Sequence, residues 1–203
     1  MSLSLSSKAR EAAAAVAEQL DTILLRDPSI RSRSEAILHP CVVAVFGHGV
    51  AHRLYRRGMY KTARALSLVA RVASGGIEIH PGARIGRRFF VDHGCGGVIG
   101  ETAVIGDDVT LFHQVTLGST GWWNDAKRGP GARRHPELRD GVTVGANATI
   151  LGPIVIGERS KVGAQALVLD DVPPHSAVHA PRGVVVEFGA ERLRLAAAVG
   201  AER

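Results

Sequence analysis

Aromatic residues are scarce in this sequence: only 4% of its 203 residues are Phe, Trp or Tyr. Glycine, in contrast, occurs 24 times. This composition argues against a helical bundle with aromatic packing and favours a core of Val, Ile, Leu and Ala with many tight turns. The length fits one large domain, or a domain with a small appendage.

Cysteine is also nearly absent, since the chain has only Cys41 and Cys95 and no CxxC. Two cysteines do not make a disulfide framework, so we expect a cytoplasmic protein. Cys95 follows His93 by two residues, which leaves a nucleophile with a nearby base conceivable. We favour the alternative, in which Cys95 is a small buried residue.

Long apolar runs and long basic runs are both missing. The apolar segment 12–17 is short and lies between Glu11 and Glu18, so we expect neither a signal peptide nor a membrane span. The net charge is +6 at pH 7. Because Lys and Arg nowhere form a run of five, we expect a solvated arginine-rich surface or a cofactor carrying phosphates, and no nucleic-acid partner.

The first part of the chain has helical patterns. Strong helix formers fill the range 12–25, and Pro28 starts a new segment. Apolar residues then recur at helical spacing over 34–72, and we expect Gly58 to break this range into two helices. The sequence therefore predicts a helical N-terminal domain over residues 1–75.

After Gly76 the pattern changes, and aliphatic residues recur every six positions, often followed directly by glycine. A period of six is neither helical nor a two-residue alternation. We interpret each hexad as one short strand and one turn, stacked into coils whose backbones pair with the coils above and below. This pattern predicts a parallel β-helix over 76–186 and a C-terminal tail or short helix over 187–203. The aliphatic positions are Ile79, Ile85, Val91, Ile99, Ile105, Leu111, Leu117, Val144, Ile150, Ile156, Val162 and Val168.

Two interruptions break the period. The range 92–98 contributes two extra residues, and a long insertion runs over about 119–140. Insertions into a stack of coils form protruding loops, often on the functional face. We therefore expect the chemistry there.

Each interruption places a histidine beside a charged residue: Asp92 precedes His93, and Arg134 precedes His135. Histidine takes and returns a proton near neutral pH, and a carboxylate can orient it. Glu78 lies fifteen residues before His93, nearly one coil of three hexads, so we expect the two on adjacent rungs. A catalytic pair and two ordinary surface histidines both remain open from this pattern alone.

We expect no metal site. His48 and His52 have the i, i+4 spacing of two ligands on a helix. Such a pair more often lies on a helix face, and no third ligand is evident in the sequence.

Several stretches resemble the serine O-acetyltransferase family of hexapeptide-repeat acyltransferases. They are RDP at 26–28, HPCVVAVFGHGVAHRLYRRG at 39–58, EIHPGARIG and DHGCGGVIGETA within 76–118, RHP at 134–136, and GANATILGPIVIG from Gly145 onward. The resemblance covers roughly 27–176, and DHG…GVIGETA is not a general hexapeptide motif. It implies an α+β fold in which a left-handed parallel β-helix follows the helices, as a homotrimer or a dimer of trimers with active sites between subunits.

The resemblance also implies a role for individual residues. The catalytic group would be His93 as general base, Glu78 as its orienting carboxylate and His135 beside the acetyl group. Asp27 and Asp92 would hold the ammonium of the substrate and Arg134 its carboxylate. The residues implied for cofactor binding are Ser119, Thr120, Ala146, Lys161 and Ala164.

The implied reaction transfers the acetyl group of acetyl-CoA, as co-substrate, directly to the hydroxyl of L-serine, giving O-acetylserine for cysteine biosynthesis. A related hydroxy amino acid as acceptor, or a non-catalytic homologue, are the alternatives. The chain ends in Arg203, where family members that dock to O-acetylserine sulfhydrylase usually end in isoleucine, so we do not expect that complex.

The insertion departs from the family pattern. It is longer than typical and carries both tryptophans of the chain, Trp122 and Trp123. These side chains either pack against a neighbouring subunit or form a lid or a remodelled acceptor pocket. Ser119 replaces a glycine of the family's GGTG, which we expect to narrow the cofactor path slightly.

Overall fold

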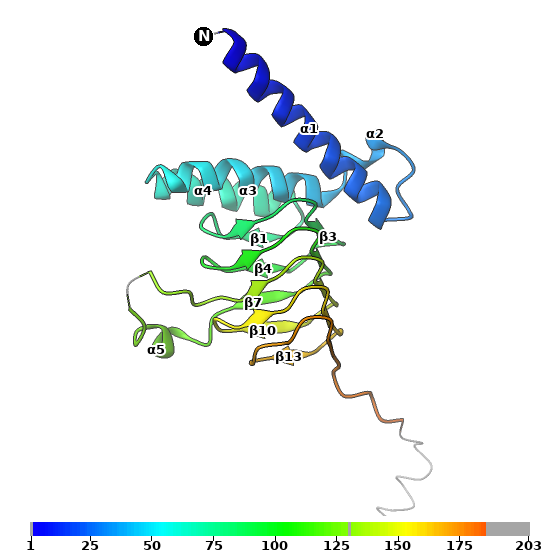
Figure 1. Cartoon of the computed structure of the whole chain (residues 1–203), viewed down its shortest axis with the longest axis vertical. Coiled ribbons are helices and arrows are strands. Elements are labelled where there is room, and N and C mark those ends of the chain that lie inside the picture. Colours follow the sequence, from blue (N-terminus) through cyan, green and yellow to red (C-terminus); the bar gives the residue numbers. More distant parts are fainter. Residues whose placement is uncertain (1, 130, 186–203) are drawn as a thin grey trace, which may run out of the picture.

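The computed structural model describes residues 2–129 and 131–185. Within these residues, the helices α1 (Ser2–Arg26), α2 (Arg33–Ala36), α3 (Pro40–Arg56) and α4 (Tyr60–Ala73) precede the strands. Figure 1 shows α3 and α4 lying across one end of the strand stack, while α1 projects away from it. The predicted break between α3 and α4 is confirmed: Gly58 lies there with a φ of +78°, which glycine adopts without strain.

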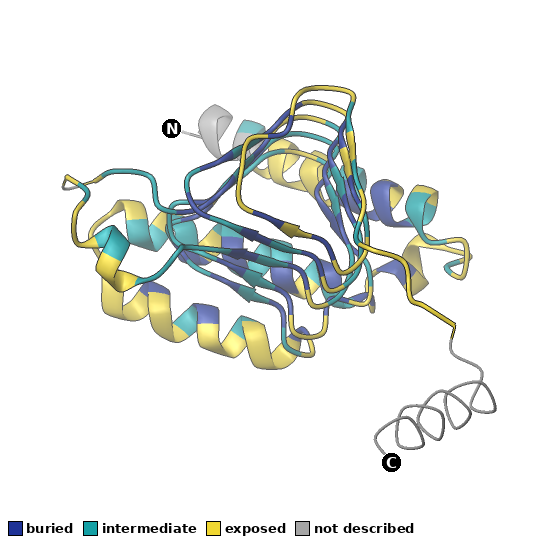
Figure 2. Cartoon of the chain, turned by 90° about the horizontal axis from the view of Figure 1, so that it is seen from below, coloured by how far each residue is buried: buried dark blue, intermediate teal, exposed yellow. Residues whose placement is uncertain are grey.

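Short parallel strands make three sheets that run along the stack. The first sheet has the order β1-β4-β7-β10-β13, the second β11-β8-β5-β2, and the third β14-β12-β9-β6-β3. Consecutive strands enter different sheets, so the chain winds as a parallel β-helix, seen end-on in Figure 2. Its coils are left-handed, as expected. The strands are β1 (Glu78–Ile79), β2 (Arg84–Ile85), β3 (Phe90–Val91), β4 (Val98–Ile99), β5 (Val104–Ile105), β6 (Thr110–Leu111), β7 (Thr116–Gly118), β8 (Glu137–Leu138), β9 (Thr143–Val144), β10 (Thr149–Leu151), β11 (Val155–Ile156), β12 (Lys161–Val162), β13 (Leu167–Val168) and β14 (Ala177–Val178).

Strand pairing fixes the length of each coil. Thr149 pairs with Leu167, which lies three hexads further along the chain. Glu78 pairs with Val98, so this coil exceeds three hexads by the two extra residues that the sequence predicts before β4. Thr116 pairs with Thr149 across the insertion, which makes that coil nearly twice as long as a regular one. Both predicted interruptions are thereby confirmed as excursions from an otherwise regular coil.

The core lies inside the coils, where the predicted aliphatic residues point. Eleven of the twelve hexad positions are at most 5% exposed, and Ile85 is partly buried against them. At about 25 cal/mol per Å² of buried apolar surface, this continuous stack of Ile, Leu and Val is the main stabilising term of the β-helix.

The insertion ends earlier than the sequence pattern predicts. Leu138 is 1% exposed and belongs to β8, which pairs with β5, so the insertion covers residues 119–136. Arg139 follows Leu138 directly, whereas glycine follows seven of the twelve predicted aliphatic positions, so this hexad lacked one of the two signals of the sequence pattern. The proposed division at 75 and 186 stays a prediction, and the tail over 187–203 lies outside the described residues.

Three corners join the sheets, and two of them carry the predicted site residues. The insertion corner joins the first sheet to the second and comprises 80–83, 100–103 and the insertion. The Asp92 corner joins the third sheet to the first and comprises 92–97, 112–115, 145–148 and 163–166. The chain turns there through left-handed conformations, with φ between 58° and 63° at His93, Gln114, Asn147 and Gln165. No helix within the described residues has both the length and the apolar character that crossing a membrane requires.

Candidate functional site

His93, the predicted general base, lies at the Asp92 corner together with two carboxylates. Its side chain is 75% exposed, and its Nε2 lies 3.7 Å from a carboxylate oxygen of Asp92. The ring of His113, one coil below, lies edge-on at a centroid distance of 6.0 Å. An exposed imidazole beside a carboxylate can accept a proton from an incoming group.

Asp27 and Asp92 come from different elements but meet at this corner. Asp27 directly follows α1, Asp92 follows β3, and their carboxylates lie within 4.8 Å of each other and of His39. Hydrogen bonds from Ser29 hold the pKa of Asp27 below its ordinary value. Two carboxylates at this spacing make a site for a cation, including an ammonium group.

The buried His39 completes this cluster and turns an N–H group toward Asp27. Its Nδ1 accepts the backbone N–H of Cys41, and burial lowers its pKa. The neutral ring therefore carries its proton on Nε2, which lies 3.7 Å from Asp27. Because a metal ligand needs a free nitrogen lone pair, this arrangement supports an ammonium site rather than a metal site.

Glu78, the predicted orienting carboxylate, lies on β1 next to the corner. Its carboxylate makes an ion pair of 2.7 Å with Arg71 of α4. Among the described residues no hydrogen bond joins Glu78 to His93. Its role toward His93 therefore stays a prediction.

His135 and Arg134 lie at the insertion corner, where Thr102 holds both. The hydroxyl of Thr102 accepts the backbone N–H groups of Arg134 at 2.8 Å and His135 at 3.1 Å. The same hydroxyl and the Thr102 N–H lie 2.9 and 3.2 Å from Nδ1 of His135. Nδ1 is thus an acceptor, and the proton of the neutral ring is on Nε2. Burial lowers the pKa of His135, which favours this neutral form.

A charged network fixes the guanidinium of Arg134. Its Nη2 donates to Glu101, and the other oxygen of Glu101 accepts the hydroxyl of Tyr55 from α3 at 2.6 Å. The hydrogen bond from Tyr55 lowers the pKa of Glu101, and the same bond raises the pKa of Tyr55 to about 12. The lowered pKa favours the ionised form of the carboxylate that Arg134 faces, and helix α3 contributes to its position through Tyr55.

The insertion folds back on this network through a short helix, α5 (Trp122–Asp125), which protrudes from the stack in Figure 1. Asp125, whose side chain is 9% exposed, lies 3.5 Å from Nη1 of Arg134. Gly121 has a φ of +114°, and a Cβ there would lie 2.7 Å from the ring of Trp123. Only glycine allows this turn, which leaves Trp122 and Trp123 mostly exposed.

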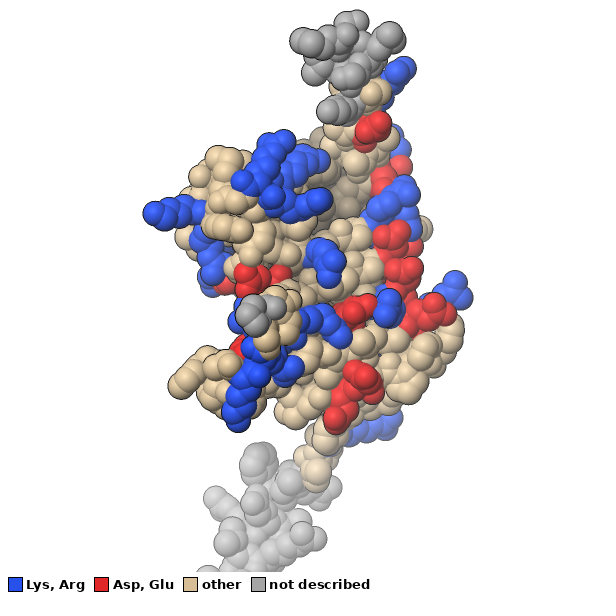
Figure 3. Space-filling view, turned by 60° about the vertical axis from the view of Figure 1, so that its left-hand side comes forward, with Lys and Arg blue, Asp and Glu red and all other residues tan. Residues whose placement is uncertain are grey.

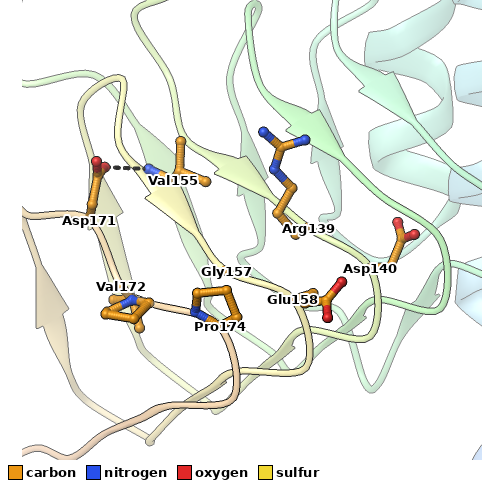
Figure 4. A pocket seen from close by; sticks show the side chains of 9 residues that line it. Arg139, Asp140, Val155, Gly157, Glu158, Asp171, Val172 and Pro174 are labelled. Carbon is orange, nitrogen blue, oxygen red and sulfur yellow. Dashed lines mark hydrogen bonds between the residues drawn. The ribbon is translucent and has the colours of Figure 1, made fainter.

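Two cavities of the β-helix differ in their relation to these residues. One of about 480 Å³ is lined by Tyr55, Glu101, Asp125 and Arg134, among others, on a face where Figure 3 shows Lys and Arg interleaved with Asp and Glu. Another, of about 590 Å³, lies between the second and third sheets around Arg139, Glu158 and Asp171 (Figure 4). None of the predicted site residues lines the second cavity.

The residues predicted for the cofactor divide between the same corners. Ser119 and Thr120 begin the insertion, and Ala146 and Ala164 lie at the Asp92 corner. Lys161 is exposed on β12 of the third sheet. Their role toward a cofactor stays a prediction.

The predicted residues thus form two groups in one chain. Asp27, Asp92 and His93 lie where the strands of the first sheet begin, and Arg134 and His135 lie where they end. The ring of His135 packs on Gly100, directly after β4, while His93 precedes β4. The first sheet separates the two groups within a chain.

Sequence reasoning missed several members of these groups. Glu101 is part of the GVIGETA motif, but the motif does not indicate that Tyr55, 46 residues away, donates a hydrogen bond to it. His39 begins the stretch 39–58 that resembles the family, but the sequence assigned it no role. Cys95, which we expected to be buried, is exposed, because it lies in a corner where the side chain points outward.

Comparisons with known proteins agree on one family. The family model "Bacterial transferase hexapeptide (six repeats)" matches residues 135–170. The serine acetyltransferase of Bacillus subtilis is 47% identical over 178 residues, which are 87% of this chain and 78% of that protein.

Solved structures are similar over the same range. Neisseria gonorrhoeae serine acetyltransferase in complex with serine has a TM-score of 0.74 at 37% identity, covering 86% of this chain and 69% of that chain. The enzyme of Brucella abortus in complex with coenzyme A has a TM-score of 0.76 at 35% identity, covering 88% and 69%. The chain is shorter than these proteins and spans 62% of serine acetyltransferase isoform 3 from Entamoeba histolytica.

Proposed function

The chain belongs to the serine acetyltransferase family, and we propose that its two corner groups together transfer the acetyl group of acetyl-CoA to the hydroxyl of L-serine. The observation that carries the acceptor assignment is the shared anchoring of Arg134 and His135 on Thr102. It places a guanidinium, which suits a carboxylate, beside an Nε2–H donor.

Each group supplies a different part of the chemistry. Arg134 binds the carboxylate of serine, and Asp27 with Asp92 binds its ammonium. His93 takes the proton of the serine hydroxyl as its oxygen attacks the thioester carbonyl carbon. Glu78 orients His93 in this proposal, once its ion pair with Arg71 opens.

The tetrahedral intermediate then needs a donor for its oxyanion. The Nε2–H of His135 has the required protonation, because Thr102 occupies Nδ1. The C–S bond breaks, the acetyl group stays on the serine oxygen, and His93 returns its proton to the CoA thiolate. Both substrates are bound together, so orientation supplies much of the rate and no acyl-enzyme is needed.

The separation of the two groups supports a shared site between copies of the chain. In a homotrimer, or a dimer of trimers, the insertion corner of one subunit would meet the Asp92 corner of the next. The CoA chain would lie in this cleft, along Ser119 and Thr120 of one subunit and Ala146 and Ala164 of the other, with Lys161 near its phosphates. The free thiols of Cys41 and Cys95 support a reducing, cytoplasmic location.

The test is release of free thiol from acetyl-CoA with L-serine. Release that requires serine, and is lost in His93→Ala while acetyl-CoA still binds, supports the function and the base. Serine-dependent release that survives this change rejects His93 as base. The same assay on a mixture of His93→Ala and His135→Ala tests the shared site, because mixed trimers regain some intact sites only if the two histidines come from different subunits.

A further inference from the structure

The guanidinium of Arg134 already has two carboxylates as partners, one on each terminal nitrogen. Nη2 donates to Glu101, and Nη1 lies 3.5 Å from Oδ2 of Asp125 in the insertion. In the proposed function this guanidinium binds the carboxylate of the acceptor. One of the two protein carboxylates must therefore share it or leave.

The two contacts differ in quality. Glu101 is anchored on both oxygens, since Tyr55 donates to the second one. Asp125 is nearly buried, yet its Oδ1 has no hydrogen-bond partner among the described residues. The cation that faces Oδ1 is Arg128, whose Nε lies 3.7 Å away and also lacks a hydrogen bond in that part of the chain. A buried carboxylate with only long contacts is costly, so Asp125 is the partner that leaves.

Resting on the proposed function, we propose that Asp125 occupies the place of the acceptor's α-carboxylate on Arg134. Asp125 and the acceptor then compete for one guanidinium, so this residue of the insertion sets the acceptor affinity. Because Asp125 ends α5, its release moves the helix that carries Trp122 and Trp123.

The kinetic test is Asp125→Asn in the full chain, which keeps the shape of the side chain and removes its charge. We expect the KM for L-serine to fall about five-fold, the size of one partly exposed ion pair, with kcat and the KM for acetyl-CoA unchanged. Glu158→Gln, an exposed carboxylate between the second and third sheets, is the matched control and leaves all three constants unchanged. A KM for serine that stays the same or rises in Asp125→Asn overturns the proposal, because Asp125 would then be neutral or would position Arg134.

A second measurement needs no turnover. The chain has two tryptophans and both are in α5, so the tryptophan emission of the full chain reports this helix alone. L-serine without acetyl-CoA should shift the emission saturably, while L-serinamide, which lacks the carboxylate, should not. The shift should be small or absent in Asp125→Asn.

The two proposals fail in different ways. Wild-type protein that acetylates serine but shows no serine-dependent emission change, or the same change with serinamide, refutes the competition and leaves the function intact. Wild-type protein without serine-dependent thiol release refutes the function itself.

Discussion

Among the glycines of residues 2–129 and 131–185, Gly100 should be the most sensitive one for catalysis, although it carries no reactive group. A Cβ built on Gly100 would lie 1.9 Å from Cδ2 and 2.1 Å from Nε2 of His135. Carbon atoms in contact are about 3.5–4.0 Å apart, so Gly100→Ala must displace the ring by well over 1 Å. The displaced ring loses its bonds to Thr102, which set its tautomer and hold its position.

The size of the effect follows from these contacts. Overpacking a filled site costs about 1–3 kcal/mol, so we expect Gly100→Ala to lower the free energy of unfolding by about 2 kcal/mol. At roughly 2–4 °C per kcal/mol for a chain of this length, the Tm falls by roughly 4–8 °C. If His135 donates to the oxyanion, its displacement lowers kcat about 100-fold or more.

A double-mutant cycle separates this mechanism from a general loss of folding. Thiol release and thermal unfolding are measured for Gly100→Ala, His135→Ala and the double variant. Without the ring, the extra methyl group has room, so the double variant should equal His135→Ala in kcat. Gly49→Ala, where a Cβ meets nothing within 4 Å, is the control and should keep full activity. Equal losses of kcat from Gly100→Ala in both backgrounds would falsify the reasoning.

Three further predictions follow from buried groups. Burial lowers the pKa of His48 from 6.5 to about 4, so the folded state resists protonation, and stability should fall by about 3 kcal/mol as pH drops from 6.5 to 4. Urea unfolding at several pH values measures this loss, which should shrink in His48→Gln; an unchanged slope contradicts it. Cys41 is fully buried with a pKa raised to about 11, whereas Cys95 is exposed, so a thiol reagent should label one cysteine in the native chain and two in urea. Rapid labelling of both in the native chain contradicts this burial. Leu138→Ala removes a core side chain and should cost about 2–5 kcal/mol in urea unfolding, whereas a true loop residue would cost almost nothing.

The coil could be predicted from the sequence because one repeat encodes it directly. An inward aliphatic residue every six positions determines where each strand and turn lies and how the coils stack. The interruptions then give the strand register: the two extra residues before β4 place Glu78 beside Val98. The pattern failed at Leu138, which lies at the end of the long insertion and is followed by Arg139 in place of the frequent glycine. It also failed at Cys95, where a small residue in a corner says nothing about which way its side chain points.

The candidate site was only half accessible to sequence reasoning. Asp92 with His93, and Arg134 with His135, are neighbours in the chain, so each pair is visible in a motif. The partners that hold these pairs come from afar: Tyr55 of α3 reaches Glu101, and His39 reaches Asp27. Such contacts depend on how the helices sit on the first coil, which no local pattern encodes.

The pairing between β7 and β10 has a consequence for how this enzyme can be altered. The chain leaves the coil at Gly118, runs through the insertion, and re-enters at Glu137 in the register that an uninterrupted coil would have. The strand register therefore does not depend on the length of that excursion, provided that the contacts of Arg134 and His135 with Thr102 are kept. A segment from a relative, or a designed segment, can therefore replace the insertion between Gly118 and Glu137. Such a replacement would change the acceptor preference at the insertion corner and leave His93 at the Asp92 corner unchanged.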